Sequence, residues 1–308
     1  MGWLAANQKQ IQETSMTIET VAFVGVGNMG APMARRVKDA GFRVMVCDKS
    51  ASALSEFAGD KVVIARTASE CASADLVIIL VGNNSQLLDV ATGAEGLVSG
   101  IPIGHRPIIC VMSTTLPKTI MSLAAPLVEK GARVIDAPVS GGIVRAEEGT
   151  LTIMMGGRED DIAEVTPVMQ VMGKHLVRCG ELGSAEVVKV VNNVLCIAAQ
   201  FLTAEAIDLA EANGVTFESI APILDVSTGR NFLTGDAVEA RRQYAAWARS
   251  EGAYVSLKNV VSKDLHLAKE LAEDHGLDLG LLDKLSNHVD GTDDYVMQQW
   301  MRHGRHEN

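Results

Sequence analysis

Cysteines, basic side chains and long apolar runs are all scarce in this chain of 308 residues. The five cysteines form no CxxC pair, which favours reduced, buried thiols in a cytosolic protein over disulfides or a zinc site. The 27 basic residues are outnumbered by 38 acidic ones, and a net charge of −11 argues against a basic surface for nucleic acid. No apolar run approaches ~20 residues, so we expect no membrane-spanning segment.

Signals for secretion, lipidation, metal binding and hydrolysis are missing as well. Residues 1–19 lack the apolar segment of a secretory signal, and Ala6 stands where a myristoylation signal needs Ser or Thr, so we expect a short extension and a cytoplasmic protein. No Ser-His-Asp or Cys-His arrangement stands out. Residues 302–306 have no carboxylate or cysteine at ligand spacing, which indicates a mobile tail and no metal site. Positions expected to be solvated and without function are His105, Arg241, Arg242, Asp293 and Asp294.

A dinucleotide-binding fingerprint follows the extension. Residues 20–30, TVAFVGVGNMG, run from an apolar strand into a GxGxxG turn and then a helical pattern. The turn alone is weak evidence, but here a second strand at 43–47 ends at Asp48, 23 positions after the first glycine. This context is typical of a βαβ unit that binds a dinucleotide. The turn predicted to hold the pyrophosphate comprises Gly25, Val26, Gly27, Asn28, Met29 and Gly30.

Each glycine of this turn has its own physical reason. Gly25 permits the tight turn, Gly27 lets the pyrophosphate approach the backbone, and Gly30 lets helix and strand pack closely. Free N–H groups and the dipole at the helix N-terminus favour phosphates. Asp48 is expected to accept hydrogen bonds from the adenosine ribose and to repel a 2′-phosphate, so NAD is favoured over NADP. Two cations that could soften this preference are Lys49 and Arg66.

The remaining pattern predicts a doubly wound, Rossmann-type parallel sheet followed by an all-α region. Unalternating runs such as LVIILV fit strands buried on both faces, with helical stretches between them. Beyond residue 214 only helical patterns occur, at 217–226, 237–250, 255–274 and 281–288. We therefore predict a Rossmann-like NAD-binding domain at 20–182 and a helical domain at 183–308. The further strands are expected at 62–64, 75–81, 108–113, 133–139 and 151–155.

Residues 183–214 form one long apolar segment that predicts a helix of about eight turns, with Ser184 as a plausible N-cap. It is apolar on nearly every side, so we expect it to be buried. Lys189 and Asn193 share one face, with Asn192 beside them. Because a buried lysine is costly unless it is paired or its pKa is lowered, Lys189 is either a proton-transfer group or a lysine that snorkels to a surface.

Polar groups follow the ends of three predicted strands, where parallel sheets bind their ligands. Asn83 follows one strand, and Thr114 follows another, where it is equally plausible as the N-cap of the next helix. Ser140, Gly141 and Gly142 offer a hydroxyl and backbone N–H groups without bulky side chains. This turn either wraps a small carboxylate or is an ordinary serine–glycine turn.

Six motifs stand in order along the chain: GVGNMG, MSTT, DAPVSGG, AEEGTLTIMMGG, GSAEVVKVVNN and KDL. Together they resemble the 3-hydroxyisobutyrate dehydrogenase group of the β-hydroxyacid dehydrogenases, a superfamily that also contains the 6-phosphogluconate dehydrogenases. The likeness covers roughly residues 20–292. Two departures are Ala185, where the family has a second glycine before the lysine, and Val81-Gly82, where Leu-Pro is common.

The resemblance implies a role for each candidate residue. Lys189 would exchange a proton with the substrate hydroxyl as general acid/base, Asn193 would help to hold the substrate, and Phe232 would form an aromatic wall over it. The implied carboxylate cradle consists of Ser140, Gly141 and Gly142. The implied contacts with the cofactor, beyond the glycine turn and Asp48, are Val81, Asn83, Thr114 and, from the C-terminal domain, Lys263.

The resemblance also implies the activity, which is NAD-dependent oxidation of a small 3-hydroxy acid. Hydroxyisobutyrate-like substrates come first and sugar acids such as threonate or glycerate next, in a homodimer or homotetramer whose long central helix joins the two domains. One alternative is an NADPH-dependent reductase of tartronate semialdehyde or glyoxylate, against which Asp48 argues. Another is an imine reductase, against which Lys189 argues. A cofactor-binding protein without turnover would not need Lys189, Asn193 and the cradle together.

Overall fold

The computed structural model describes residues 18–59 and 61–305 of the chain. The predicted N-terminal extension therefore lies almost entirely outside the described residues, as does His306 of the tail. The chain divides into two compact units, one up to Lys189 and one from Val190 onward. We call them unit 1 and unit 2 and describe each by itself.

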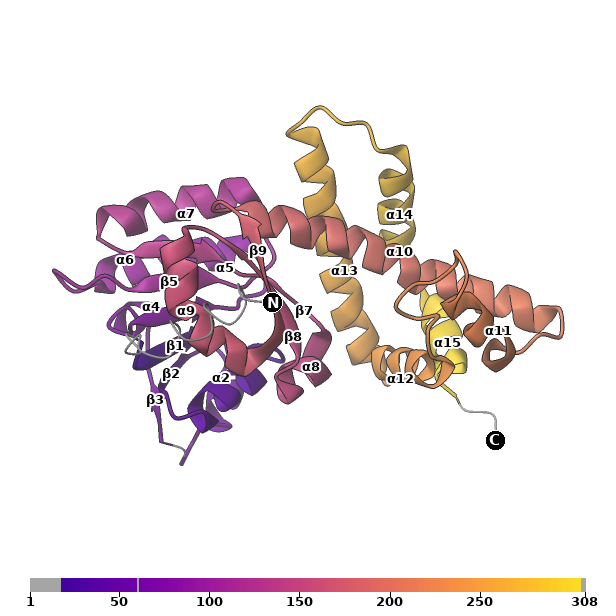
Figure 1. Cartoon of the computed structure of the whole chain (residues 1–308), viewed down its shortest axis with the longest axis horizontal. Coiled ribbons are helices and arrows are strands. Elements are labelled where there is room, and N and C mark those ends of the chain that lie inside the picture. Colours follow the sequence, from indigo (N-terminus) through magenta and orange to yellow (C-terminus); the bar gives the residue numbers. More distant parts are fainter. Residues whose placement is uncertain (1–17, 60, 306–308) are drawn as a thin grey trace, which may run out of the picture. The chain divides into compact units, whose positions relative to one another are not determined.

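Unit 1 is built on a nine-stranded sheet in the order β3-β2-β1-β4-β5-β6-β8-β7, with β9 paired to β8 (Figure 1). The strands from β3 to β6 are parallel, and this 3-2-1-4-5-6 order is that of a doubly wound dinucleotide-binding fold. The Rossmann-type prediction is thus confirmed. The parallel strands are β1 (Thr20–Val24), β2 (Arg43–Cys47), β3 (Val62–Ile64), β4 (Leu76–Ile79), β5 (Ile108–Val111) and β6 (Arg133–Asp136).

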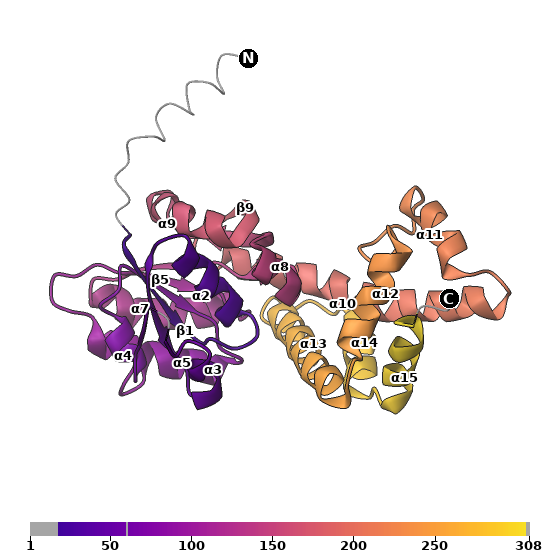
Figure 2. The ribbon, with the colours of Figure 1, turned by 90° about the horizontal axis from the view of Figure 1, so that it is seen from below.

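Helices cover both faces of this sheet, as Figures 1 and 2 show from two sides. Alternate β1 residues point to opposite faces, so Phe23 joins one buried apolar cluster while Ala22 joins the other. The first cluster is closed by α2 (Gly30–Asp39), α8 (Gly142–Glu148) and α9 (Glu159–Met172). The second is closed by α4 (Ala68–Cys71), α5 (Asn84–Thr92), α6 (Leu97–Gly100) and α7 (Pro117–Glu129). The short α3 (Ala51–Ser55) follows β2.

The last part of the sheet departs from the prediction of one strand at 133–139. Strand β6 ends at Asp136, and after Ala137-Pro138 the chain re-enters the sheet as β7 (Val139–Ser140), antiparallel to β8 (Leu151–Gly156). Proline has no N–H to give to a ladder, which is a reason for the break. Strand β9 (Gly173–Gly180) was not predicted, because it lies at an edge and most of its side chains are not buried.

The long helix α10 (Ser184–Ala212) begins within unit 1 and continues into unit 2. The prediction that it is buried on all sides is wrong for the single chain. Leu195, Leu202 and Leu209 are 69%, 63% and 70% exposed, whereas the opposite stripe is buried. By length and composition this helix could cross a membrane, contrary to the expectation drawn from the lack of a continuous apolar run. One such helix is weak evidence, since the core helix of a globular protein passes the same test.

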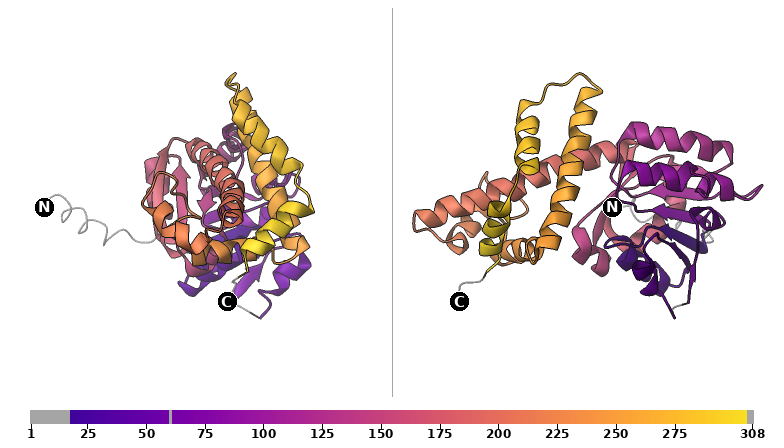
Figure 3. Two further views of the ribbon diagram at one scale, coloured as in Figure 1. Left: turned by 90° about the vertical axis from the view of Figure 1, so that its right-hand side faces the viewer. Right: turned by 180° about the vertical axis from the view of Figure 1, so that it is seen from behind.

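Unit 2 contains only helices within its described residues, 190–305, which Figure 3 shows from two further sides. Helix α15 differs from the prediction of a solvated pair of acidic residues at Asp293 and Asp294. Asp293 in fact caps this helix by accepting a hydrogen bond from the Tyr295 backbone N–H at 2.9 Å. The other four helices confirm the predicted segments to within a few residues. The helices that follow α10 are α11 (Phe217–Asp225), α12 (Ala237–Trp247), α13 (Glu251–Glu273), α14 (Gly280–Asp290) and α15 (Asp294–His303).

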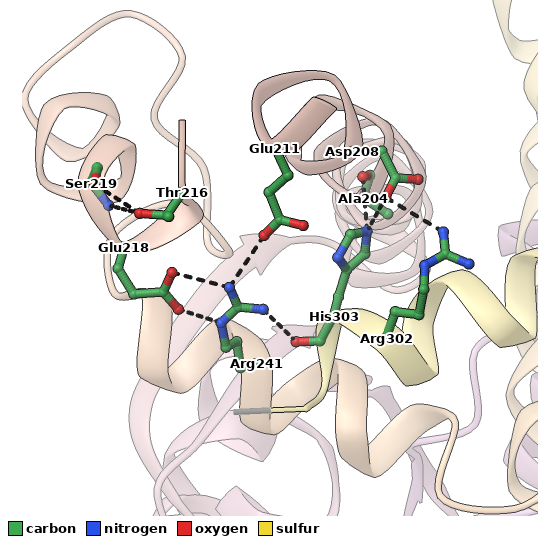
Figure 4. A network of polar contacts seen from close by, with 9 residues as sticks. All are labelled: Ala204, Asp208, Glu211, Thr216, Glu218, Ser219, Arg241, Arg302 and His303. Atoms are coloured by element: carbon green, nitrogen blue, oxygen red, sulfur yellow. Dashed lines mark hydrogen bonds and ion pairs between the residues drawn. The ribbon is translucent and has the colours of Figure 1, made fainter. Parts of the chain in front are cut away.

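A polar network fastens α15 to its neighbours and corrects two predictions (Figure 4). Arg241 is buried, forms ion pairs with Glu218 and Glu211, and donates to the backbone carbonyl of His303 at 3.0 Å. His303 is 2% exposed, and its Nε2 lies 3.1 Å from the Ala204 carbonyl oxygen. Arg241 is therefore no solvated residue, and residues 302 and 303 belong to a packed helix and not to a mobile tail.

His105 is a third position where the prediction was wrong. Its side chain is only partly exposed, and Nε2 lies 3.0 Å from the carbonyl oxygen of Ala74. Arg242, Asp293 and Asp294 are exposed as predicted. The cysteines are free, and Cys47, Cys71 and Cys110 are buried, in agreement with the prediction of reduced thiols, while Cys179 and Cys196 are half-buried.

Candidate active site

The glycine turn has the shape that a dinucleotide requires. Gly25 has φ +99°, and a Cβ on it would lie 2.1 Å from the backbone oxygen of Leu80. A Cβ on Gly30, the first residue of α2, would lie 2.1 Å from the backbone oxygen of Gly25. Gly27 is exposed, and a Cβ there would meet nothing within 4 Å, so its outer side is open to a ligand. Between them, Val26 is buried, Asn28 exposed and Met29 half-buried.

Asp48 is tied to this turn. Its Oδ2 accepts a hydrogen bond from the Val26 backbone N–H at 2.8 Å, and its Oδ1 accepts one from the Ser50 N–H at 2.8 Å. The half-buried carboxylate is thus held at the end of β2, beside the turn. Of the two cations that could attract a 2′-phosphate, Lys49 forms an ion pair with Asp89 at 3.0 Å. The carboxylate of Asp48 favours a ribose without a 2′-phosphate, so NAD fits beside this turn better than NADP.

The carboxyl ends of β4 and β5 meet at the same edge of the sheet. The Val81 N–H donates to the Ser113 hydroxyl at 2.7 Å, and Asn83 caps α5 by accepting from the Gln86 N–H at 2.9 Å. Helix α7 has Leu116 as its N-cap residue with no side-chain cap, so the alternative reading of Thr114 as this N-cap is wrong. Thr114 follows the end of β5 and is half-buried.

The proposed carboxylate cradle lies between β7 and α8. Gly141 and Gly142 are exposed and have φ values of +140° and +72°, which side chains other than hydrogen rarely allow. Ser140 is the half-buried last residue of β7. The side chain of Arg145 packs over Gly141, with its Cδ 2.7 Å from the position that a Cβ would take. The Arg145 guanidinium is exposed and forms no ion pair within the described residues, so it adds a positive charge to the cradle.

Lys189 lies in the second turn of α10 and is only 9% exposed, so the predicted burial of this lysine is found. The helix that carries it is fastened to the sheet by Asp136, the last residue of β6. Asp136 Oδ1 accepts from the Gly183 N–H at 2.7 Å, and Oδ2 accepts from the Glu186 N–H at 3.0 Å. Asp136 rather than the predicted Ser184 therefore satisfies the first N–H groups of α10, because Ser184 is itself the first helical residue.

Two of the three candidate residues in unit 2 are joined by a carboxylate. Asp264 is 4% exposed, accepts from Asn193 Nδ2 at 2.6 Å and forms an ion pair with Lys263 at 2.8 Å. Asn192 donates to Asn193 at 3.1 Å, which fixes the amide further. Phe232 stands apart from them, half exposed, with its ring 6.4 Å from that of Trp247.

Sequence reasoning missed Asp136, Arg145, Glu186 and Asp264. Asp136 and Asp264 stand inside motifs that had been singled out, DAPVSGG and KDL, where the signal was a charged residue directly beside a candidate. Glu186 is an acidic residue in the first turn of an apolar helix, and it is fully buried. Arg145 is the only basic residue in the turn and helix that follow the cradle. None of these roles could be assigned without knowing which backbone atoms lie opposite.

A pocket of about 670 Å³ lies elsewhere in unit 1, at the amino end of β6. It is lined by Arg106, Arg133, Arg158, Asp161 and Glu181 among others, and no predicted site residue lines it. No group of three His, Cys, Asp or Glu side chains that could hold a metal ion occurs in the part of the chain that the structure describes. The predicted cofactor-binding residues of unit 1 follow the carboxyl ends of the parallel strands instead.

Comparison with known proteins places this geometry in a family. The pattern described as the NAD binding domain of 6-phosphogluconate dehydrogenase matches residues 20–183, and that described as the NAD-binding domain of NADP-dependent 3-hydroxyisobutyrate dehydrogenase matches residues 183–296. The mitochondrial 3-hydroxyisobutyrate dehydrogenase of Homo sapiens is 33% identical over 264 residues, covering 82% of this chain and 75% of that protein. The NAD-dependent L-serine dehydrogenase of Pseudomonas aeruginosa is 32% identical over 265 residues, covering 83% and 86%.

Solved structures agree with the sequence comparisons. The 3-hydroxyisobutyrate dehydrogenase of Mycobacterium tuberculosis, solved with L-serine, has a TM-score of 0.76 and 27% identity, covering 89% of this chain and 93% of that one. The matched patterns and relatives support NAD as the cofactor and a hydroxyacid as the substrate. The chain therefore belongs to the 3-hydroxyisobutyrate dehydrogenase-like β-hydroxyacid dehydrogenases, and it is an NAD-dependent hydroxyacid dehydrogenase.

Proposed function

We propose that this enzyme oxidises the hydroxyl group of a small 3-hydroxy acid, with Lys189 as the general acid/base. The observation that carries the proposal is a lysine of 9% exposure on a helix whose first turn is bonded to Asp136, four residues before the cradle serine. A surface lysine would need neither the burial nor the anchored helix. The rarity of buried lysines makes such a residue a candidate for chemistry.

The chemistry divides between the cofactor and the protein. When bound, NAD accepts the hydride that leaves the carbon bearing the hydroxyl. The proton of that hydroxyl passes to the side-chain nitrogen of Lys189, which must be neutral to accept it, and burial disfavours the charged ammonium. In the opposite direction the ammonium returns the proton to the oxygen. The products are the semialdehyde or ketone, the reduced cofactor and one proton.

The carboxylate of the substrate is assigned to the cradle. The Ser140 hydroxyl and the backbone N–H groups of Gly141 and Gly142 are donors without bulky side chains, and the guanidinium of Arg145 adds charge beside them. Donors fixed by the backbone lose little entropy when they bind, so they orient the acid for transfer. Asn193, Phe232 and Lys263 remain predictions as further contacts, the first two with the substrate and the third with the cofactor.

We rank the candidate substrates by the position of the hydroxyl group. Both 3-hydroxyisobutyrate and L-serine, named in the relatives, carry a hydroxyl on carbon 3, which is two bonds from the carboxylate carbon. We place such 3-hydroxy acids first and threonate or glycerate next. We further propose a cytoplasmic homodimer or homotetramer, although several relatives are named as mitochondrial.

The test is absorbance of reduced nicotinamide with a panel of hydroxy acids, each with NAD and with NADP. Turnover of a 3-hydroxy acid with NAD supports the proposal and names the substrate. Turnover only of tartronate semialdehyde or glyoxylate with NADPH would favour the reductase alternative. Cofactor binding without turnover across the whole panel would overturn the proposal.

A further inference from the structure

The side chain of Asp136 is enclosed by protein on every side. Its side chain is 0% exposed. A Cβ on Gly156 would lie 2.4 Å from Asp136 Oδ1, so only glycine at position 156 leaves room for the carboxylate. Gly183, whose N–H donates to the same oxygen, has φ +90°, which also favours glycine. Burial raises the pKa of Asp136, and the N–H donors of Gly183 and Glu186 act in the opposite direction.

This one carboxylate links two parts of the proposed site. Asp136 ends β6, and the chain from it runs through Ala137-Pro138 directly into β7 and the cradle at Ser140. Its two oxygens hold the Gly183 and Glu186 N–H groups at the start of α10, and Lys189 follows Glu186 by three residues on the same face of the helix. The positions of the cradle and of Lys189 therefore both depend on the side chain of Asp136.

A second bond fixes the rotation of that helix turn. Glu186 is 0% exposed, and its Oε2 accepts from the Thr115 N–H at 3.0 Å. Thr115 in turn donates its hydroxyl to Asn84 Oδ1 at 2.7 Å. The first turn of α10 is thus bonded to β6 through Asp136 and to the segments after β5 and β4 through Glu186. These are the strand ends at which the cofactor is expected.

We propose that Asp136 is a positioning residue that sets where Lys189 lies relative to the carboxylate cradle. This inference rests on the proposed function, in which the cradle holds the substrate acid and Lys189 takes the proton. Asp136 itself is enclosed by protein and has no exposed surface with which to contact a ligand. Its effect is on the geometry of transfer, where a displacement of about 1 Å costs about 100-fold in rate.

The experiment compares Asp136→Asn with Asp75→Asn. Asparagine keeps the shape of aspartate, but its NH₂ group cannot accept a hydrogen bond. One of the two bonds from the N–H groups of Gly183 and Glu186 is therefore lost. Asp75 is the matched control, because its Oδ2 likewise accepts from two backbone N–H groups, those of Glu19 and Thr20 at 3.0 and 2.8 Å, at the amino end of β1. Gly156→Ala displaces the Asp136 carboxylate without changing its charge.

We expect Asp136→Asn and Gly156→Ala to lower kcat by about 10- to 100-fold while the Kd for NAD changes less than about threefold. Asp75→Asn should leave kcat unchanged even where it lowers the melting temperature. An unchanged kcat in Asp136→Asn would overturn the inference, because the carboxylate would then have a structural role only. A loss of kcat in Asp75→Asn as large as that in Asp136→Asn would overturn it too, because the loss would not be specific to the Asp136 carboxylate.

Hydrogen–deuterium exchange separates this inference from the proposed function. In Asp136→Asn the amides of residues 183–187 should exchange at least tenfold faster than in wild type, whether or not any hydroxy acid is turned over. Unchanged exchange there would overturn the positioning role. Faster exchange in a protein that oxidises no hydroxy acid would mean that Asp136 holds the helix as inferred and that the proposed substrate class is wrong.

Discussion

Asp48 is a carboxylate from which we expect both a contribution to the fold and a role in the choice of cofactor. One oxygen accepts from the glycine turn and the other from the residue two positions further on, so the charge is held at the end of β2. A phosphate brought to this position would meet a negative charge, whereas the hydroxyls of an unphosphorylated ribose would meet acceptors. We therefore expect the preference for NAD to depend on the charge of Asp48 more than on its shape.

Replacing Asp48 by asparagine should change the cofactor preference. Asparagine retains an acceptor for the Val26 N–H but removes the charge, so kcat/KM with NADP should rise and the ratio of NAD to NADP efficiency should fall by about tenfold, equivalent to ~1.4 kcal/mol. The ratio is measured with one hydroxy acid and both cofactors. Asp39→Asn, at an exposed carboxylate that ends α2, is the control. An unchanged ratio would mean that Asp48 does not select the cofactor.

Arg145 gives a second prediction about a single side chain. It packs over Gly141 and carries a positive charge beside the cradle, so Arg145→Ala should raise KM for a hydroxy acid by about fivefold, which corresponds to ~1 kcal/mol for an exposed charge pair. The kcat should change little, because the reacting atoms are not touched. Arg158→Ala, at an exposed arginine near the other end of the strands, should have no effect. If both variants behave alike, the Arg145 charge does not bind the acid.

The residues that the sequence predicts differ physically from those that it does not predict. The glycine turn, Asp48 and Lys189 belong to local patterns, in which the signal and its reason lie within a few residues. Asp136 bonds to groups 47 and 50 positions away, and Asp264 to an amide 71 positions away. Such pairings arise only when the sheet and helices are assembled, so the sequence showed the motifs but not the bonds.

Among the helices and strands, those with a strong apolar period were predicted and those that depend on neighbours were not. The parallel strands β4 and β5 are buried on both faces, and their unalternating apolar runs made them predictable. Strand β9 is largely unburied and has no such signal. Helix α15 buries Val296, Trp300 and His303 against unit 2, but a buried histidine resembles a surface residue when only the sequence is known.

The docking of α15 should depend on pH through His303. Burial lowers the pKa of His303 below its ordinary value of 6.5, so the unfolded chain binds the proton more strongly than the folded one. Stability from the neutral side chain is therefore present above pH 6.5 and is lost as pH falls below it. Thermal unfolding of wild type should lose stability between about pH 7 and pH 5 more steeply than that of His303→Gln.

The glutamine variant is chosen because its amide can still donate to the Ala204 carbonyl oxygen and carries no titrating group. His275→Gln, at an exposed histidine, is the control and should follow the wild-type curve. Parallel curves for wild type and His303→Gln would show that His303 is not the group responsible. The prediction concerns stability and does not involve the catalytic step.

At the scale of the whole molecule, helix α10 presents an apolar stripe that the described residues, 18–59 and 61–305, do not cover. Val188, Leu195, Leu202 and Leu209 recur every seven residues along α10 and are 41–70% exposed. Seven residues are almost two helical turns, so these side chains share one face. An aligned apolar face of this length is typical of an interface, and the family resemblance assigns it to a second copy of the chain.

Introducing a charge on this stripe should break the assembly. Leu202→Glu should convert a dimer or tetramer to a smaller species, because an unpaired carboxylate in an apolar interface costs several kcal/mol. Sedimentation velocity gives the mass directly. Ile223→Glu, at a residue of α11 that is 61% exposed, is the matched control and should keep the wild-type mass. A wild-type chain that sediments as a monomer would contradict the proposed assembly.

The most direct test of the central claim is the rate of hydride transfer in Lys189→Ala, followed by absorbance of the reduced nicotinamide. We expect this variant to bind NAD as wild type does and to lose about 100- to 10,000-fold in kcat, while Lys130→Ala, at an exposed lysine, loses nothing. If Lys189→Ala keeps the wild-type rate, Lys189 is not the general acid/base, and its burial in α10 has a structural reason only.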